Sequence, residues 1–237
     1  PPPVYSKQIR EGAGYPPPVS NRWGILGIIF LTRLSMGFQF QSIASVAPFL
    51  VDDFQVGYGQ VGVLMGLYLL PGGVIALPGG MLGSRFGERR LVLIGLTLMA
   101  AGGLILAASD TFAVASAGRI VSGIGGVLMN VLLAKMVADW FQGKEIATAM
   151  GVMLTSWPIG MGLALASLGT VAAQHSWRGA VHLTVVAAVV AFVLMLLFYR
   201  NPRAVPTGGA GRLIPGLAPR ELALATAFHI DGVRGAH

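Results

Sequence analysis

Six long apolar stretches follow one another along this chain and limit what it can fold into. Each holds roughly the 20 apolar residues that a helix needs to cross a hydrocarbon core of about 30 Å, and the segments between them are short and polar. A soluble domain with a buried core can supply one or two such stretches, but not six in series. The expected transmembrane helices are Trp23–Leu50, Val61–Gly83, Leu91–Ala108, Phe112–Ala138, Ile146–Ala173 and Ala180–Tyr199.

The composition agrees with an exterior that faces lipid. Only 11% of the residues are charged and 54% are hydrophobic, whereas soluble domains carry about 25% charged residues. The 34 glycines fit as well, since glycine is frequent in membrane helices, where it lets backbones approach closely. With no cysteine, the sequence indicates no redox compartment. The fold class that follows is an all-α integral membrane protein of six transmembrane helices.

The positive charges lie mainly on one side of these stretches. With a cytoplasmic N-terminus, the outer loops hold one arginine, Arg178, together with three acids, Asp52, Asp53 and Asp110. The inner segments then hold Lys7, Arg10, Arg22, Arg85, Arg89, Arg90, Lys144, Arg200, Arg203, Arg212 and Arg220. This asymmetry follows the positive-inside rule and predicts the cell (inner) membrane, with both termini cytoplasmic. The net charge of +7 then reflects topology and the lipid bilayer as partner, not nucleic-acid binding.

A segment rich in glycine and arginine, residues 80–90 (GMLGSRFGERR), joins the second and third stretches. In spacing and position it resembles the signature loop of the major facilitator superfamily, G-x-L-x-D-R-x-G-R-R/K. The matching residues are Gly80, Leu82, Arg85, Gly87 and Arg89. Glycine permits a tight turn, and arginine can cap helix C-termini and pair with nearby acids. The alternative is a generic cytoplasmic loop anchored by its positive charge.

Two positions of this loop depart from the family pattern. Ser84 stands where the family has Asp, and Glu88 where it has Arg. In the family these positions take part in a charge network with an acid at the end of the fourth helix, and Asp139 matches that acid. Because one acid and one base are lost, the resemblance implies at most a gating pair of Asp139 with Arg85 or Arg89.

The resemblance extends to the fourth stretch, where residues 119–126 (RIVSGIGG) are similar to the family's R-x-x-x-G-x-G motif. Arg-x-x-x-Gly also occurs in the first stretch, at Arg33 and Gly37, and the second and fifth stretches each carry a proline closely followed by glycine. The resemblance therefore implies a 3+3 inverted repeat, half of a twelve-helix major facilitator fold, with the binding site where the repeats meet. Lys135 and Asp139, four residues apart, are expected to pair.

An arginine inside the first stretch is the main candidate for substrate chemistry. Arg33 lies about 15 Å along its helix, and a charge at that depth marks a functional candidate because burying it is costly. No Asp or Glu lies in the middle of any stretch, so this charge needs an anion, carbonyl dipoles or water. We expect Arg33 to bind substrate with Gln41 and Asn130; the alternative is a structural tie to carbonyls. Arg119 is a further candidate, for which the structural role is favoured.

The resemblance implies a secondary active transporter of small solutes that works by alternating access, and Arg33 without a carboxylate favours a small organic or inorganic anion as substrate. Residues 38–50 and 156–160 also resemble the cyanate and nitroimidazole branch, related to nitrate and nitrite porters. A multidrug or lipophilic-compound exporter of the same superfamily and a non-transporting half-unit stay open as alternatives. The sequence contains no zinc-binding HExxH pair, nucleophile elbow or Walker loop, so we expect no catalysis, metal or cofactor.

Two polar tails flank the membrane domain, residues 21–200. Residues 1–20, with two Pro-Pro-Pro runs, are expected to form a disordered cytoplasmic lead. Residues 201–237 resemble the cytoplasmic linker between halves, followed by a truncated start of the second half. The chain is thus expected to be either a fragment or a six-helix unit that pairs with a second half or with a copy of itself.

Overall fold

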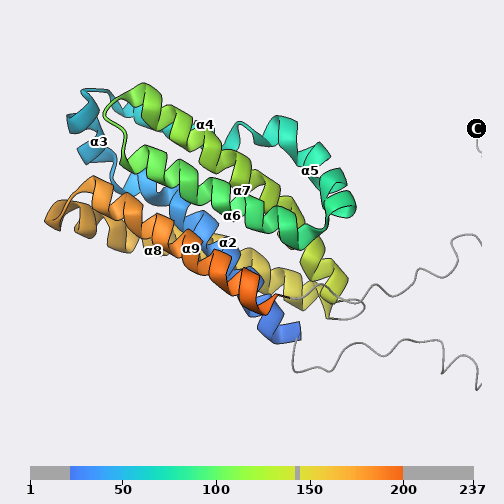
Figure 1. Ribbon diagram of the computed structural model, residues 1–237. Helices are drawn as coiled ribbons and strands as arrows, with labels where there is room; N and C mark the ends of the chain where they lie inside the picture. The colour runs from blue at the N-terminus through green and yellow to red at the C-terminus, as the bar shows by residue number, and fades with distance from the viewer. Residues whose placement is uncertain (1–21, 142–144, 200–237) are drawn as a thin grey trace, which may run out of the picture. The chain divides into compact units, whose positions relative to one another are not determined.

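The computed structural model describes residues 22–141 and 145–199, and every element in that part of the chain is a helix (Figure 1). The two tails, residues 1–20 and 201–237, lie outside the described residues, as does Lys144. The helices are α2 (Arg22–Ser45), α3 (Ala47–Phe54), α4 (Tyr58–Leu69), α5 (Gly72–Phe86), α6 (Glu88–Ala107), α7 (Phe112–Trp140), α8 (Ile146–Gln174) and α9 (Trp177–Phe198).

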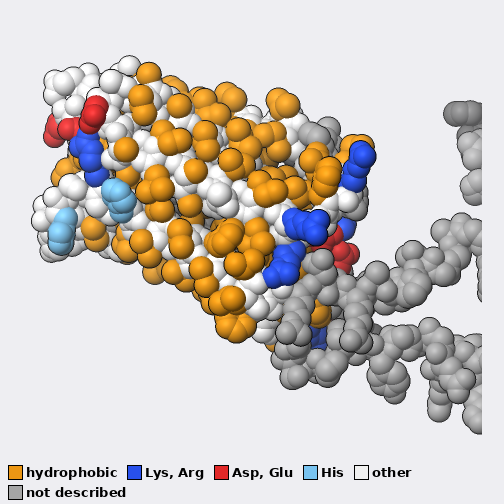
Figure 2. All heavy atoms as spheres, in the orientation of Figure 1, with side chains coloured by type: hydrophobic (Ala, Val, Ile, Leu, Met, Phe, Trp, Pro, Cys, Tyr) orange, Lys and Arg blue, Asp and Glu red, His pale blue; other side chains and the backbone are white. Residues whose placement is uncertain are grey.

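Six helical segments of the described chain are long and apolar enough to cross a membrane, in agreement with the six expected stretches. Their bounds are Arg22–Ser45, Tyr58–Ile75, Glu88–Ala107, Phe112–Trp140, Ile146–Gln174 and Trp177–Phe198. In Figure 2, hydrophobic side chains cover the middle of the visible face, and charged and histidine side chains gather toward its two ends. The protein is therefore a multi-pass membrane protein, as the sequence predicts.

The first two expected stretches are each divided into two helices, which the hydropathy pattern does not reveal. A turn at Val46 separates α2 from α3, whose first turn holds a proline. Pro71 caps α5, and the chain turns there because proline offers no N–H to continue α4. Pro158, by contrast, lies inside α8 without ending it.

The helices pack as an inverted repeat requires. In a 3+3 repeat, α2, the α4–α5 pair and α6 correspond to α7, α8 and α9. The packing of α2 against α8 then corresponds to the packing of α7 against α4 and α5. The packing of α6 against α7 likewise corresponds to the packing of α9 against α2. All of these contacts are present. The described helices therefore have the 3+3 inverted arrangement that was expected.

A glycine permits close backbone approach at each of the two equivalent contacts. A Cβ on Gly37 of α2 would overlap the backbone carbonyl of Trp157 in α8, and a Cβ on Gly123 of α7 would overlap that of Tyr68 in α4. Only glycine fits at such a distance, so the helix backbones touch without intervening side chains. The glycines of the two Arg-x-x-x-Gly segments are thus packing residues, and they fix where the neighbouring arginines lie.

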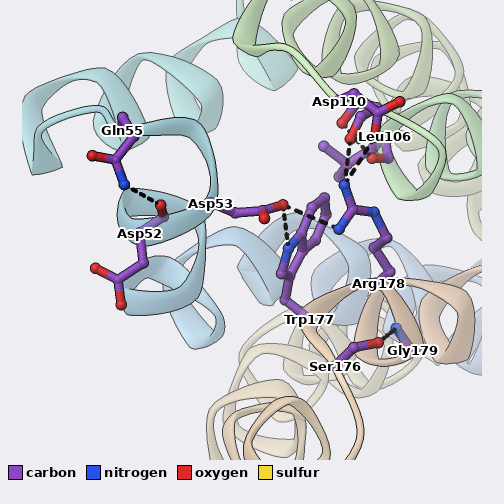
Figure 3. A network of polar contacts seen from close by, with 10 residues as sticks. Asp52, Asp53, Gln55, Leu106, Asp110, Ser176, Trp177, Arg178 and Gly179 are labelled. Atoms are coloured by element: carbon purple, nitrogen blue, oxygen red, sulfur yellow. Dashed lines mark hydrogen bonds and ion pairs between the residues drawn. The ribbon is translucent and has the colours of Figure 1, made fainter.

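At the end of the bundle expected to face outward, one arginine joins three parts of the chain (Figure 3). Arg178, at the start of α9, pairs with Asp53 of α3 at 3.1 Å and with Asp110 before α7 at 3.2 Å. It also donates to the Ser109 carbonyl at 3.0 Å, and the Trp177 indole donates to Asp53 at 2.9 Å. At this end of the bundle, α3, the segment between α6 and α7, and α9 are therefore held together by one guanidinium and one indole.

Substitutions at two glycines of α8 can distinguish the effect of helix packing on stability from the effect of helix propensity. A Cβ on Gly160 would overlap the Leu34 carbonyl of α2, whereas a Cβ on Gly162 would meet nothing within 4 Å. We expect Gly160→Val to lower the free energy of unfolding by about 1–3 kcal/mol, because it overpacks the contact between α2 and α8. Gly162→Val, its matched control, should be near neutral. Thermal unfolding in detergent measures both, and equal losses would contradict the packing role.

Candidate functional site

A cavity of about 370 Å³ lies among α2, α4, α5, α7 and α8. Its lining is mostly apolar and aromatic, with one cation and one amide. The lining residues are Arg33, Met36, Tyr68, Leu69, Gly72, Gly126, Val127, Asn130, Val131 and Trp157. Small-molecule sites have this character, since roughly 300–1,000 Å³ of largely apolar surface carries a few polar groups that orient the ligand.

Arg33 is the charged residue of this lining, and its hydrogen-bonding capacity is only partly used. One terminal nitrogen of the guanidinium donates to the side-chain oxygen of Asn130 on α7. The guanidinium carbon lies 6.0 Å from the ring centroid of Trp157, within reach of a cation–π interaction. The Nε atom is buried without a hydrogen-bond partner among the described residues. The cavity therefore holds a cation that has no carboxylate partner in its lining.

Arg119 occupies the equivalent place in the second repeat, but its donors are taken. It is fully buried, and it donates to the carbonyls of Leu64 at 3.1 Å, Gln39 at 3.3 Å and Phe40 at 3.2 Å. Its guanidinium carbon lies 4.7 Å from the ring centroid of Tyr68. Arg119 thus ties α7 to α4 and α2 by carbonyl dipoles, the structural role favoured from the sequence, and it does not line the cavity.

Of the four residues predicted to bind substrate, the structure brings Arg33 and Asn130 together and leaves Arg119 and Gln41 apart from them. Gln41 is buried in α2 and does not belong to the cavity lining. The reason is helical geometry: eight residues separate Gln41 from Arg33, about 12 Å along the axis at 1.5 Å per residue. A shared helix face does not place two side chains at one depth in the membrane.

The aromatic walls of the cavity were missed from the sequence. Tyr68 on α4 and Trp157 on α8 both line it, and each ring centroid lies 5.5 Å from that of Phe40 on α2. The signal that could have found them is positional, since each aromatic residue shortly precedes a proline, Pro71 or Pro158, in corresponding helices of the two repeats. The three rings form one cluster beside the guanidinium of Arg33.

The signature loop contains the tight turn that its glycines suggest. Gly87 has a φ of 87°, a left-handed conformation that glycine adopts without strain, and it lets α6 begin at Glu88 directly after α5. Gly80 lies within α5. Arg85 lies in the last turn of α5 with its side chain exposed, and its guanidinium carbon lies 5.8 Å from the centroid of the Phe86 ring.

The ion pairs at this end differ from the expected gating pair. Asp139 lies 3.5 Å from Lys135, as predicted, and not against Arg85 or Arg89 among the described contacts. Lys135 also pairs with Glu88, the residue that departs from the family pattern. Arg89 instead donates to a backbone carbonyl of α9. The departure at Glu88 is therefore compensated by a lysine on α7, which sequence reasoning did not connect across 47 residues.

The described helices form a multi-pass membrane protein built as a six-span inverted repeat, with a cavity among α2, α4, α5, α7 and α8. A family model described as the Major Facilitator Superfamily matches residues 29–228. The chain belongs to the major facilitator superfamily. Its membrane-spanning helices and its inverted repeat are those of that family of transporters.

The individual relatives are distant and longer. The quinolone resistance protein NorB of Staphylococcus aureus (strain JH9) is 24% identical over 172 residues, which cover 72% of this chain and 37% of NorB. The proton:xylose symporter XylE has the same fold, with a TM-score of 0.70 and 16% identity over 77% of this chain and 46% of its own. The peptide transporter POT gives a TM-score of 0.60 and 19% identity over 88% and 44%. The chain thus spans less than half the length of these relatives.

The two arginines of the repeats should respond differently to the same substitution. We expect Arg119→Met to lower the free energy of unfolding by about 2 kcal/mol or more, because charge-assisted hydrogen bonds to three carbonyls are lost. Arg33→Met, its matched control, should cost less than half of that, since Arg33 has one hydrogen-bond acceptor and borders a cavity. Thermal unfolding in detergent gives both values. A larger loss at Arg33 would contradict the assignment of roles.

The charge pair between α6 and α7 can be tested by reversal. Lys135→Glu should destabilise the protein by about 1 kcal/mol, because it places an acid beside Glu88 and Asp139. Adding Glu88→Lys should restore part of the loss, since the pair forms again with opposite sense. Arg90→Glu, on an exposed residue of the same loop, is the control for charge alone. Additive effects of the two reversals in a double-mutant cycle would show that the pair contributes nothing.

Proposed function

We propose that the protein is a secondary transporter that moves a small organic or inorganic anion by alternating access, with Arg33 and Asn130 as its substrate contacts. It would work in the cell inner membrane with both termini in the cytoplasm, as the charge asymmetry predicts. The observation that carries the proposal is the guanidinium of Arg33, which lines the cavity with no carboxylate beside it and with its Nε atom unpaired.

Electrostatics favours an anion over a cation at this site. An arginine far from water is costly unless another group compensates its charge, and Asn130 supplies only an amide dipole. An anion that enters the cavity provides that compensation, whereas a cation would meet the guanidinium's repulsion. The charge of Arg119 is compensated in a different way, because three backbone carbonyls accept hydrogen bonds from its guanidinium. Arg33 has no such set of acceptors, so its position favours a ligand.

A second six-helix unit is the partner that best fits the helices around the cavity. The spans formed by α4–α5 and α8 contribute Tyr68 and Trp157 to the lining, yet they are the least buried spans, at 22% and 28%. Both expose large apolar side chains, among them Leu70 and Leu165. We propose that a second half, or a second copy of this chain, covers these helices and closes the cavity from that side.

A drug exporter of the same superfamily is the second candidate. It is favoured by the similarity to a quinolone resistance protein and by the ring cluster of Phe40, Tyr68 and Trp157 beside the cavity. The two candidates differ in the charge of the ligand. An exporter of lipophilic cations should bind tetraphenylphosphonium and tolerate the loss of Arg33, whereas an anion carrier should not.

Ligand binding to the purified chain tests the proposal without requiring a second unit. We expect nitrate, cyanate, formate or benzoate to bind, and Arg33→Ala to weaken the binding at least tenfold, because the compensating cation is gone. Asn130→Asp should weaken it similarly, since the new carboxylate neutralises Arg33. Arg90→Ala, which removes an exposed cytoplasmic arginine, is the matched control. Isothermal titration in nanodiscs provides the affinities, and proteoliposome uptake tests transport.

The result that would refute the anion proposal is equally specific. If Arg33→Ala and Asn130→Asp bind every anion as the unaltered chain does while both insert normally, Arg33 is not the substrate contact. If tetraphenylphosphonium alone binds, the exporter candidate takes its place.

A further inference from the structure

The cavity lining constrains the substrate beyond the sign of its charge. Its charged side chain and its amide side chain meet at one place, where Arg33 of α2 contacts Asn130 of α7. The remaining side chains of the lining are those of Met36, Tyr68, Leu69, Val127, Val131 and Trp157. A small inorganic anion would exchange its hydration shell for one guanidinium and a largely apolar wall, which is unfavourable. An apolar body gains by leaving water for the same wall.

A ligand with a single negative charge is enough to neutralise the one cationic side chain of this cavity lining. Arg33 is the single cationic residue of the lining, and one of its terminal nitrogens is already engaged by Asn130. The equivalent arginine, Arg119, is committed to the carbonyls of Leu64, Gln39 and Phe40. A ligand with two negative charges would keep one of them uncompensated in an apolar environment. The site therefore fits a monoanion.

The position of the rings favours an apolar body next to the charged group. The Trp157 ring lies 6.0 Å from the Arg33 guanidinium carbon, and it is backed by Phe40 at 5.5 Å between ring centroids. The Tyr68 ring lies at the same centroid distance from Phe40, 5.5 Å, and also lines the cavity. Because aromatic faces and edges pack well with planar apolar groups, a planar body can lie against these rings while its anionic group meets Arg33.

We propose that the ligand is an amphipathic organic monoanion, with one carboxylate or similar group at Arg33 and Asn130 and an apolar, preferably aromatic, body against Trp157, Tyr68 and Val131. The proposal rests on the function proposed above and narrows it, because it excludes inorganic anions as the preferred substrates. The cavity volume of about 370 Å³ lies within the range that accommodates such organic ligands.

A series of ligands that share one charge and differ in apolar size tests this inference. Isothermal titration of the full 237-residue chain in nanodiscs would compare nitrate, formate, benzoate and 2-naphthoate, with 2-naphthamide as the neutral analogue of the largest. We expect affinity to rise at least tenfold from formate to 2-naphthoate, because each ring buries apolar surface. The neutral amide should bind at least tenfold more weakly than the carboxylate, since it leaves Arg33 uncompensated.

Two valines provide matched variants. Val131→Asn places an amide in the apolar wall and should weaken 2-naphthoate binding about tenfold while leaving formate nearly unchanged. Val152→Asn makes the same change on α8 outside the cavity lining and should leave both affinities as they are. Far-ultraviolet circular dichroism verifies that both variants keep their helices.

The outcomes separate the failure of this inference from the failure of the proposed function. If nitrate and formate bind as tightly as 2-naphthoate, and all are lost in Arg33→Ala, the site binds anions but has no preference for an apolar body, and the inference is overturned. If 2-naphthamide binds as tightly as 2-naphthoate, and Arg33→Ala changes neither, the cavity is not an anion site and both proposals fail.

Discussion

The close contact of α2 with α8, and of α7 with α4, is the constraint from which the rest of the bundle follows. Gly37 and Gly123 allow backbones to touch at these two crossings. Each glycine lies one helical turn after an arginine, so the contact also carries that arginine to the ring of the facing helix. Arg33 thereby reaches Trp157, and Arg119 reaches Tyr68. Backbone packing thus determines where the two arginines within the spans lie.

The two repeats share this packing, but their arginines have different hydrogen-bond partners. At Arg119 three backbone carbonyls converge on the guanidinium, which is fully buried and needs no further ligand. At Arg33 the described acceptor is one amide oxygen, and a cavity lies beside it. The inverted repeat therefore supplies two similar positions, of which one is satisfied by backbone carbonyls and the other borders the cavity. The proposed site rests on this loss of symmetry rather than on the presence of an arginine.

Much of the fold could be predicted from the sequence, because the requirement for apolar stretches is local. The six spans, the inverted repeat and the pairing of Lys135 with Asp139 all depend on residues within one helix or on their spacing. What could not be predicted depends on groups brought together by folding. Pro71 and Pro158 have similar sequence neighbours, yet only Pro71 interrupts its span.

The candidate site could also be predicted only in part, because its geometry depends on groups from different helices. Arg33 and Arg119 have the same Arg-x-x-x-Gly context, and carbonyls from α2 and α4 decide their difference. The partner of Glu88 is likewise absent from its local sequence, because Lys135 lies on another helix. Hydropathy indicated that Arg33 was costly to bury, which was enough to select it. Only the packed structure shows that Asn130 accompanies it and that Gln41 does not.

The distribution of polar contacts along the bundle suits a unit that moves as one body. Arg178 joins α3, the α6–α7 turn and α9 at one end, and Lys135 joins α6 to α7 at the other. Between these ends, close glycine contacts and the hydrogen bonds of Arg119 to carbonyls of α2 and α4 hold the helices together. In the alternating access proposed above, rocking of one six-helix half against another would change the orientation of this unit and leave its internal contacts in place. Arg33 and Trp157 belong to α2 and α8, whose backbones touch, so the charge and the ring of the proposed site would move together and keep their geometry when the cavity opens to either side.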